Sequence, residues 1–271
     1  MEICKAILLG IIQGITEWLP VSSTGHMLLF DAFFPMHVSE ACKNLFLVLV
    51  QLGSILAVVC LYGRTLNPLS PKKSQTEKRK AWLLWAKVLV ASVPVGVVGI
   101  LANDYVDEHL HSWQVVAGAL FVYGVLFLIL EKRNRKREFR ITDIDDISFG
   151  DALKTGCFQA LSLVPGTSRS GSTILGGMLV GLDRTVASTF SFFMAIIPMF
   201  GASLLKLVKA GFALQGQEWF IIAAGTLSAF LVSLISLRGL VSYVKKHDFS
   251  VFGWYRIILA VLVTVAFTCL L

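Results

Sequence analysis

Two short polar segments interrupt long apolar stretches of the chain, and both carry side chains that can bind an anion or move a proton. The first break, residues 15–26, reads ITEWLPVSSTGH, and the second break, residues 163–172, reads LVPGTSRSGS. Glu17 and His26 flank a run of hydroxyl residues, whereas Arg169 lies between two serines. A carboxylate and an imidazole can exchange protons, and a guanidinium offers a planar fork of donors to phosphate oxygens. The two breaks therefore predict one site that handles an anion.

The first break must join two helices. Gln13, which is predicted to bind the ligand, and Glu17 are four residues apart and share one helix face, and Pro20 ends that helix. Hydroxyl side chains and free backbone N–H groups at the start of the next short helix form an anion cradle. The residues of this predicted cradle are Ser22, Ser23, Thr24 and Gly25. The alternative is that the hydroxyls only cap the helix, but capping does not require Glu17 or His26.

The second break offers the same elements with the opposite charge. Glycines on both sides of Arg169 let the backbone approach a ligand closely. The predicted ligand-binding residues here are Gly166, Thr167, Ser168, Ser170 and Gly171. The alternative is a structural Arg169 that pairs with Glu17. Gln51, in an otherwise apolar stretch, is either a ligand of the site or an interhelical hydrogen-bond partner.

Composition indicates that lipid surrounds these elements. Hydrophobic residues make up 56% of the 271 positions and charged residues 15%, against about 25% charged in soluble domains. The net charge of +7 comes from basic residues between apolar runs, which favours membrane topology over nucleic-acid binding. An ionisable group at membrane depth costs about 2.5 to 3.5 kcal/mol on insertion scales, so Glu17 and His26 are predicted to be functional.

The chain is predicted to be an all-α integral membrane protein with six transmembrane helices and two re-entrant helical hairpins. The predicted spans are residues 45–63, 82–102, 114–130, 186–205, 219–237 and 254–271. The second arms of the hairpins, about 24–34 and 171–181, reach only about half of a bilayer. Glu2, Lys5 and Glu17 do not suit a cleaved signal peptide, so we expect the N-terminal segment to be retained.

The two halves are predicted to form an inverted-topology repeat within one membrane domain. Basic linkers at 64–87 and 131–154 indicate the cytoplasmic side, and the 103–112 segment is expected to be an outside loop. Each half, 1–135 and 145–271, then crosses the membrane an odd number of times. An ungapped offset of 146 residues aligns the breaks; for example, Gln13 falls on Gln159 and Ser22 on Ser168. Inverted repeats place a polar site between broken helices at the midplane.

Other polar residues of the apolar stretches are given structural roles. Lys87, Arg184 and Arg256 lie near the ends of hydrophobic segments and are predicted to extend to the membrane interface. The five cysteines form no metal-ligand spacing, and they are interpreted as small buried hydrophobic residues. They are Cys4, Cys42, Cys60, Cys157 and Cys269.

At these residues the sequence resembles the undecaprenyl-diphosphatase family, which is linked to bacitracin resistance. QGITEWLPVSSTGH resembles the family's (E/Q)xxxE motif and LPVSSTGH run, and LVPGTSRSGSTILGG resembles its PGxSRSG motif. QLGSILAV at 51–58 is similar to a third family segment. The first position of the (E/Q)xxxE motif is Gln13 here instead of Glu. Glu17 is therefore the only carboxylate of the first break, and Gln13 cannot act as a charged metal ligand.

The resemblance implies hydrolysis of undecaprenyl diphosphate at the outer face of the bacterial cytoplasmic membrane. Glu17, Ser23, His26 and Arg169 would then be the catalytic set. Ser23 is the preferred nucleophile, with His26 as its proton acceptor or as the nucleophile itself. Glu17 would orient His26 or hold Mg²⁺ or Ca²⁺, so a divalent cation is expected but no organic cofactor.

The expected partners are a polyprenyl diphosphate lipid and the membrane, with a homodimer as an alternative to a monomer. A transporter or flippase for an anionic lipid or small anion is the alternative function, because inverted repeats with broken helices also build transport sites. The Ser, His, Glu and Arg set favours hydrolysis, since binding an anion requires donors but no base.

Overall fold

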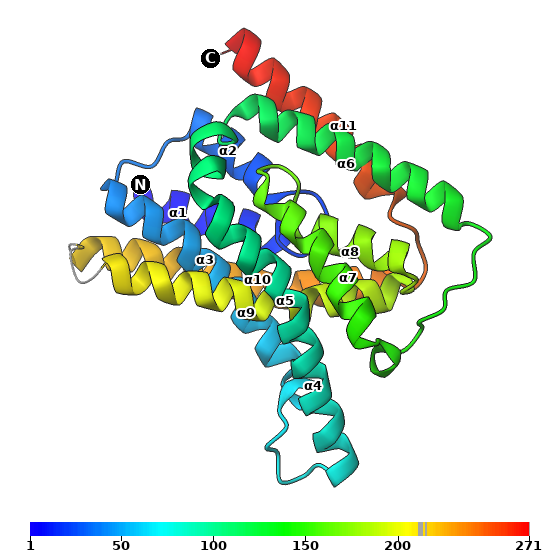
Figure 1. Ribbon diagram of the computed structural model, residues 1–271. Coiled ribbons are helices and arrows are strands. Elements are labelled where there is room, and N and C mark those ends of the chain that lie inside the picture. Colours follow the sequence, from blue (N-terminus) through cyan, green and yellow to red (C-terminus); the bar gives the residue numbers. More distant parts are fainter. Residues whose placement is uncertain (211–213, 215, 271) are drawn as a thin grey trace.

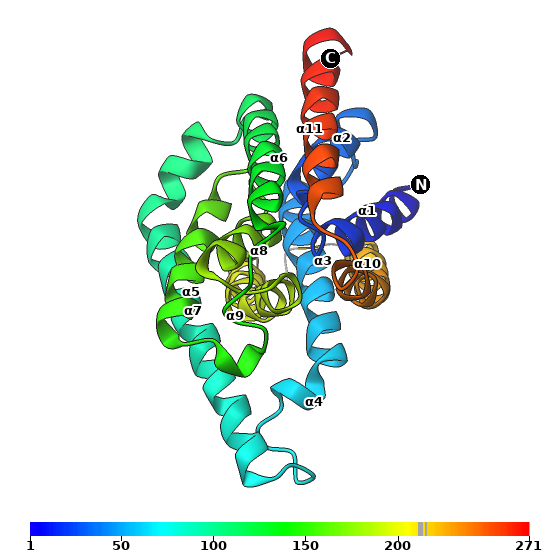
Figure 2. The same cartoon turned by 90° about the vertical axis from the view of Figure 1, so that its right-hand side faces the viewer.

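The chain forms a bundle of helices, which the computed structural model describes for residues 1–210, 214 and 216–270 (Figures 1 and 2). Among these residues, six helices are long and apolar enough to cross a membrane. They are α3 (Glu40–Leu61), α5 (Gln75–His109), α6 (Trp113–Asn134), α9 (Arg184–Ala210), α10 (Gly216–Val244) and α11 (Ser250–Val265). The predicted multi-pass, all-helical membrane class is confirmed.

Each break separates two shorter helices, as predicted. The first break joins α1 (Glu2–Thr16) to α2 (Ser23–Phe33), and the second joins α7 (Phe149–Ala160) to α8 (Arg169–Val180). The remaining elements are α4 (Gly63–Leu66), a 3-10 turn at Ile144–Asp146, a second at Leu161–Leu163 and a π-helical end at Ala266–Leu270. In the described part of the chain, the only β-type pairing is an isolated bridge between Ile141 and Leu182.

The helices extend beyond the predicted apolar runs. The helix α5 begins at Gln75 because Ser74 and Glu77 form a reciprocal capping box, which starts the helix in polar sequence. It also continues to His109, so most of the predicted outside loop at 103–112 is helical. Hydropathy marks the part of a helix that suits lipid, whereas caps decide where the helix begins.

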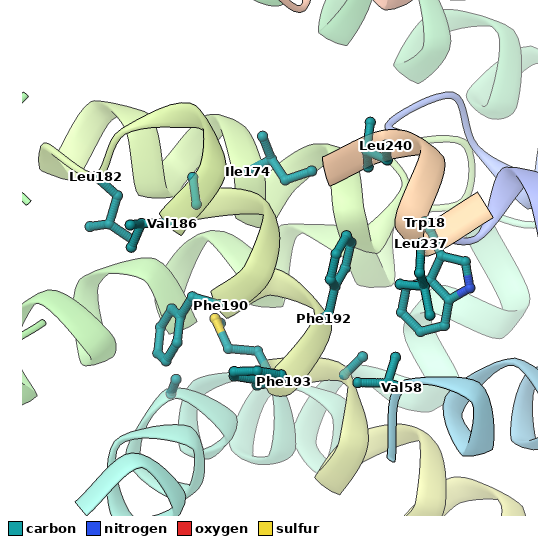
Figure 3. Close-up of a cluster of buried hydrophobic side chains, with 14 of the residues drawn as sticks. Trp18, Val58, Ile174, Leu182, Val186, Phe190, Phe192, Phe193, Leu237 and Leu240 are labelled. Atoms are coloured by element: carbon teal, nitrogen blue, oxygen red, sulfur yellow. The ribbon is translucent and has the colours of Figure 1, made fainter. Parts of the chain in front are cut away.

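The helix α9 supplies much of the largest buried cluster (Figure 3). Phe190, Phe192 and Phe193 are fully buried on it. The ring of Trp18, from the first break, meets Phe192 edge-on with ring centroids 5.4 Å apart. The first break is therefore anchored against a helix from the other half of the chain.

Polar contacts join the two basic linkers at one end of the bundle. Lys80 forms an ion pair with Asp145 at 2.6 Å, and the Lys87 Nζ donates to the Asp145 carbonyl at 2.9 Å. Arg184 pairs with the buried Glu131, with Nε 2.9 Å from Oε1. Lys87 is only 8% exposed, so it does not extend freely to an interface as predicted.

The cysteine prediction is wrong for four of the five residues. Cys42 is buried, but the other four are exposed on the outer surface of the bundle, and all five are free thiols. An apolar sequence context does not imply burial in a membrane protein, because helix faces that contact lipid are as apolar as the protein core. The exposed cysteines are Cys4, Cys60, Cys157 and Cys269.

Candidate functional site

The two breaks share one backbone conformation at the residue that starts the following helix. Ser22 has φ 71° and Ser168 has φ 70°, and they are the only described non-glycine residues with positive φ. The Ser22 side chain accepts from the Gly25 N–H at 3.4 Å, and the Ser168 side chain accepts from the Gly171 N–H at 3.1 Å. Each serine therefore caps the start of the helix that follows its break.

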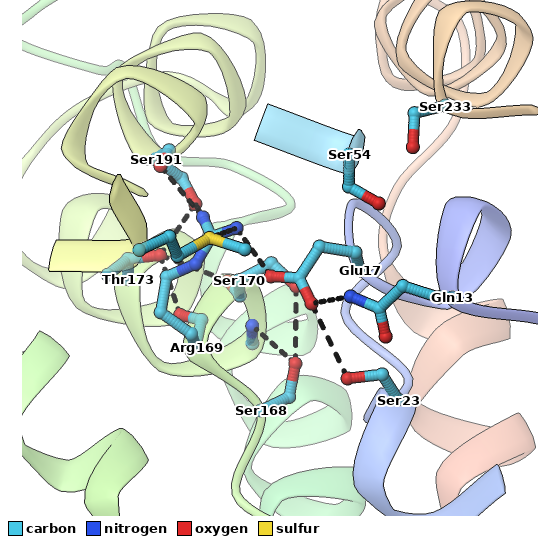
Figure 4. A network of polar contacts seen from close by, with 12 residues as sticks. Gln13, Glu17, Ser23, Ser54, Ser168, Arg169, Ser170, Thr173, Ser191 and Ser233 are labelled. Carbon is cyan, nitrogen blue, oxygen red and sulfur yellow. Dashed lines mark hydrogen bonds and ion pairs between the residues drawn. The ribbon is translucent and has the colours of Figure 1, made fainter. Parts of the chain in front are cut away.

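Glu17 and Arg169 connect the two breaks through an ion pair (Figure 4). The Arg169 Nη2 lies 2.8 Å from the Glu17 Oε1, and Glu17 is only 7% exposed. The second carboxylate oxygen accepts from the Gln13 Nε2 at 2.8 Å and lies 3.5 Å from the Ser23 Oγ. The carboxylate thus contacts both the guanidinium and a hydroxyl of the predicted site.

The guanidinium of Arg169 is oriented by α9. Its Nη1 donates to the Ser191 carbonyl at 2.8 Å and lies 3.3 Å from the Ser191 Oγ, which in turn contacts the Thr173 Oγ1 at 2.6 Å. The Trp18 ring lies below the guanidinium carbon at 5.4 Å. These contacts fix the plane of the fork, whose Nη2 donates to Glu17.

A cavity of about 280 Å³ lies between the breaks. Helices α5 and α9 contribute apolar walls to it, including Val95, Pro198 and Met199. The cavity combines a carboxylate, hydroxyls, amides and a guanidinium, which suits a ligand with several oxygen atoms beside an apolar portion. The predicted site residues that line it are Glu17, Ser23, Thr24, Gln51, Gly166, Ser168 and Arg169.

The remaining predicted ligand-binding residues do not line the cavity, and some of them contact residues of the two breaks. Gln13 binds Glu17, and the Ser170 Oγ donates to the Leu19 carbonyl of the first break at 3.1 Å. A Cβ at Gly25 would lie 3.0 Å from the Leu120 side chain, so the packing there is already close. The predicted residues outside the cavity lining are Gln13, Ser22, Gly25, Thr167, Ser170 and Gly171.

His26 lies apart from the carboxylate that was predicted to orient it. Its Nδ1 is 2.7 Å from the Ser22 carbonyl and its Nε2 is 2.6 Å from the Tyr255 hydroxyl on α11. It lines a separate, mostly apolar depression with Phe30. The predicted contact between Glu17 and His26 is therefore wrong for this structure, because both ring nitrogens are occupied elsewhere and Glu17 instead contacts Arg169.

The prediction for Arg256, that its side chain extends to the membrane interface, is wrong. Arg256 is instead fully buried. Its Nη1 donates to the Pro20 carbonyl at 3.1 Å, and its Nη2 donates to the carbonyls of Gly166 and Thr167 at 2.8 and 2.9 Å. The guanidinium also lies 5.4 Å from the Tyr123 ring centroid. Arg256 therefore holds the first and second breaks together through their backbones.

Two further polar residues of the cavity were not predicted as site residues. Gln159 and Ser162, from the arm before the second break, both line it. The offset of 146 residues already aligns Gln159 with Gln13, so this alignment of the two breaks contained the signal that could have identified Gln159. For Ser191 no such signal existed, because one serine among apolar residues on α9 is indistinguishable from others on that helix.

Comparison with known proteins settles the family. The family described as bacitracin resistance protein BacA matches residues 6–262. The chain belongs to the BacA family. Among its BacA relatives, a protein from Lactiplantibacillus plantarum is 52% identical over 271 residues, covering 99% of this chain and 98% of the relative. Proteins from Enterococcus faecalis and Clostridioides difficile are each 50% identical, covering 94% and 98% of this chain and 94% and 97% of the relatives.

These BacA relatives carry closely similar names. The proteins from Lactiplantibacillus plantarum and Enterococcus faecalis are named undecaprenyl-diphosphatase, and that from Clostridioides difficile is named undecaprenyl-diphosphatase 1. The family resemblance inferred from the motifs of the two breaks is thereby confirmed over nearly the whole chain.

Proposed function

We propose that this protein hydrolyses undecaprenyl diphosphate to undecaprenyl phosphate and inorganic phosphate. The single observation that carries the proposal is the contact of Glu17 with both Arg169 and Ser23 in a cavity between two helix starts. A transport site for an anion would need the donors but not a carboxylate beside a hydroxyl. The names of its BacA relatives support the same substrate.

In the proposed reaction Arg169 turns from Glu17 to the phosphate oxygens, which it can bind in bidentate fashion. The N–H groups at the starts of α2 and α8 add donors for the same oxygens. Ser23 Oγ attacks the terminal phosphorus, and the bond from that phosphorus to the bridging oxygen breaks, releasing the prenyl monophosphate. Glu17 accepts the Ser23 proton from 3.5 Å away.

Water then attacks the phosphorus of the phosphoserine, the bond from phosphorus to the Ser23 oxygen breaks, and the proton on Glu17 returns to that oxygen. Both water protons leave with the inorganic phosphate as H₂PO₄⁻. Ser23 is preferred over His26 as nucleophile because Ser23 lines the cavity and His26 does not. Direct attack by water is the alternative. A phosphoserine trapped at residue 23 by rapid acid quench would distinguish the two.

His26 was predicted to accept the Ser23 proton or to act as the nucleophile, and here we propose it instead as a second acid or base beside Glu17. It follows Ser23 by one helical turn on α2, so a change of side-chain rotamer moves the imidazole relative to the Ser23 hydroxyl. Its bonds to Ser22 and Tyr255 must then open. His26 also holds the Ser22 carbonyl, so it positions the turn that presents Ser23.

We propose that a divalent cation binds together with the substrate. Among the described residues no three His, Cys, Asp or Glu side chains gather into a metal cluster, so the protein alone is a poor cage. Glu17 and the buried Gln13 Oε1, which has no hydrogen-bond partner in the described part of the chain, would hold the ion, since carboxylate and amide oxygens are ligands of Mg²⁺ and Ca²⁺. The ion would supply positive charge against the phosphate.

We also propose that the two broken helix pairs are re-entrant hairpins of an inverted repeat. The matching Ser22 and Ser168 conformations support this, as does the packing of α1 on α10 and of α7 on α5. Gly10 permits the first of these contacts, since a Cβ there would lie 2.3 Å from the Gly225 carbonyl oxygen. Gly156 permits the second, with the Ala91 carbonyl oxygen also at 2.3 Å.

We assign the site to the outer face of the bacterial cytoplasmic membrane, where it would recycle the lipid carrier for cell-wall polymers and support bacitracin resistance. The basic linkers at 64–87 and 131–154, joined by the Lys80–Asp145 pair, would lie inside. A Cys placed at Ser74, after removal of native cysteines, should resist an impermeant thiol reagent in intact cells. Labelling of that residue would overturn the assignment, and the predicted homodimer stays a prediction.

The activity is tested with the purified protein in detergent and C55 or C15 prenyl diphosphate, following phosphate release. Wild-type protein should release phosphate and Ser23→Ala should not. A matched control is Ser188→Ala, a buried serine on α9 whose hydroxyl donates to the Arg184 carbonyl at 2.7 Å outside the cavity. Folded wild-type protein that binds the diphosphate without hydrolysing it would favour the transport alternative.

A further inference from the structure

Gln159 is a buried polar side chain without a hydrogen bond that would explain its position in the fold. It lies on the last turn of α7, is fully buried and lines the same cavity as Glu17, Ser23 and Arg169. Neither its Nε2 nor its Oε1 has a hydrogen-bond partner among the described residues. An unpaired buried amide destabilises a fold, so a residue kept in this state requires another explanation.

The corresponding residue of the first break shows what is missing. Gln13, which the offset of 146 aligns with Gln159, donates its Nε2 to the Glu17 carboxylate at 2.8 Å. The position that aligns with Glu17 is Leu163, which also lines the cavity but has no acceptor in its side chain. The second break therefore keeps the donor of this pair without the acceptor, and the donor borders the cavity.

We propose that the acceptor is the substrate itself: the Gln159 side-chain amide donates a hydrogen bond to a phosphate oxygen of the bound diphosphate. The inference rests on the proposed function and adds a substrate-binding residue to that site. A neutral amide suits this place because Arg169 already supplies the charge, and a second carboxylate at residue 163 would repel the ligand. Gln159 is a binding residue and takes no part in proton transfer.

The test uses Gln159→Leu, which keeps nearly the same volume and removes both polar atoms. Because a hydrogen bond to a charged group is lost, kcat/KM should fall roughly 10- to 100-fold, mainly through a higher KM. The thermal stability of the ligand-free variant should equal or exceed that of wild type, since no protein hydrogen bond is removed. A structural role predicts the reverse, with lower stability and an unchanged KM.

Asn134→Leu is the matched control. Asn134 ends α6 and is 2% exposed, and neither of its amide atoms has a hydrogen-bond partner among the described residues. It does not line the cavity. Its replacement should have the same effect on ligand-free stability as the replacement of Gln159 and leave kcat/KM unchanged. Gln159→Glu provides a second variant of the same size, and its negative charge should weaken diphosphate binding more than Gln159→Leu does.

A binding measurement separates this inference from the proposed function. Farnesyl methylenediphosphonate, which cannot be hydrolysed at its bridging atom, should raise the melting temperature of wild type and of Asn134→Leu, but much less that of Gln159→Leu. An equal rise in all three proteins, together with a wild-type KM in Gln159→Leu, would overturn the inference. Absence of hydrolysis by wild type would instead contradict the proposed function, while the binding comparison would still report on Gln159.

Discussion

The two breaks have nearly the same backbone and opposite chemistry. Ser22 and Ser168 start their helices at φ 71° and 70°, and each accepts from the N–H three residues on. The first break places the carboxylate of Glu17 in the cavity, whereas the second places the guanidinium of Arg169 there. The difference teaches that two turns of the same conformation each start a helix, while the side chains beside them supply an acid at one turn and a cation at the other.

The largest expected effect follows from removing the acid of the first break. Glu17→Gln keeps the size of the side chain but removes the proton acceptor beside Ser23, so kcat should fall about 10²- to 10⁴-fold. Phosphate release by folded protein in detergent measures this. A near wild-type kcat would show that Glu17 does not accept a proton in the reaction and that the first break contributes only to the form of the cavity.

His26→Ala tests whether the first break holds a second proton-transfer group. A drop in kcat of at least ~10²-fold is expected, the lower end for a general acid or base. Tyr255→Phe removes the hydrogen-bond partner of the His26 Nε2 and is the control for position alone. If Tyr255→Phe lowered kcat as much as His26→Ala, the histidine would act by holding α2 and not by moving protons.

Arg169→Lys tests whether the second break recognises phosphate by geometry. Lysine keeps the charge and loses the planar fork, and each charge-assisted bond contributes about 1.5 to 3 kcal/mol, so kcat/KM should fall roughly 10- to 100-fold. Arg169→Ala should be worse. A double variant Glu17→Gln, Arg169→Gln with near wild-type activity would reduce the pair to a structural ion pair.

The smallest effect concerns the shared turn. Ser168→Ala should lower the free energy of unfolding by about 0.5 to 2 kcal/mol, and Ser168→Gly by only a few tenths, because glycine tolerates positive φ. The shorter bond of Ser168, 3.1 Å against 3.4 Å for Ser22, should make Ser22→Ala milder. Thermal melts in detergent compare the three variants, and equal losses would show that the caps do not differ.

Much of this arrangement was predictable because it depends on local signals. Pro20 and the hydroxyl run predicted a break, and helix α2 begins at Ser23, one residue before the predicted second arm at 24–34. The placement of Glu17 and Arg169 in one site was predicted from the alignment of the two breaks, whereas their direct ion pair was only the alternative interpretation of Arg169. What is local in sequence, such as a cap or a helix end, could be inferred without the structure.

The positions of His26 and Arg256 could not be inferred in the same way. Both depend on which face of α11 meets the breaks. The Tyr255 hydroxyl forms a hydrogen bond with the His26 imidazole, and the adjacent Arg256 donates hydrogen bonds to backbone carbonyls of the breaks. An arginine near the end of an apolar run usually extends to the interface. Only the packing of α11 on α6 reveals that three carbonyl oxygens are available to it inside the protein.

Arg256 also affects how products leave. It is fully buried, and no carboxylate forms an ion pair with it in the described part of the chain. Glu17 neutralises only one of the two guanidinium charges beside the breaks, so the pocket region keeps an excess of positive potential. That potential attracts the more highly charged diphosphate more strongly than the lipid monophosphate. Under the proposed function, cleavage would therefore weaken the electrostatic attraction between the pocket and the lipid and would favour release of the monophosphate into the membrane.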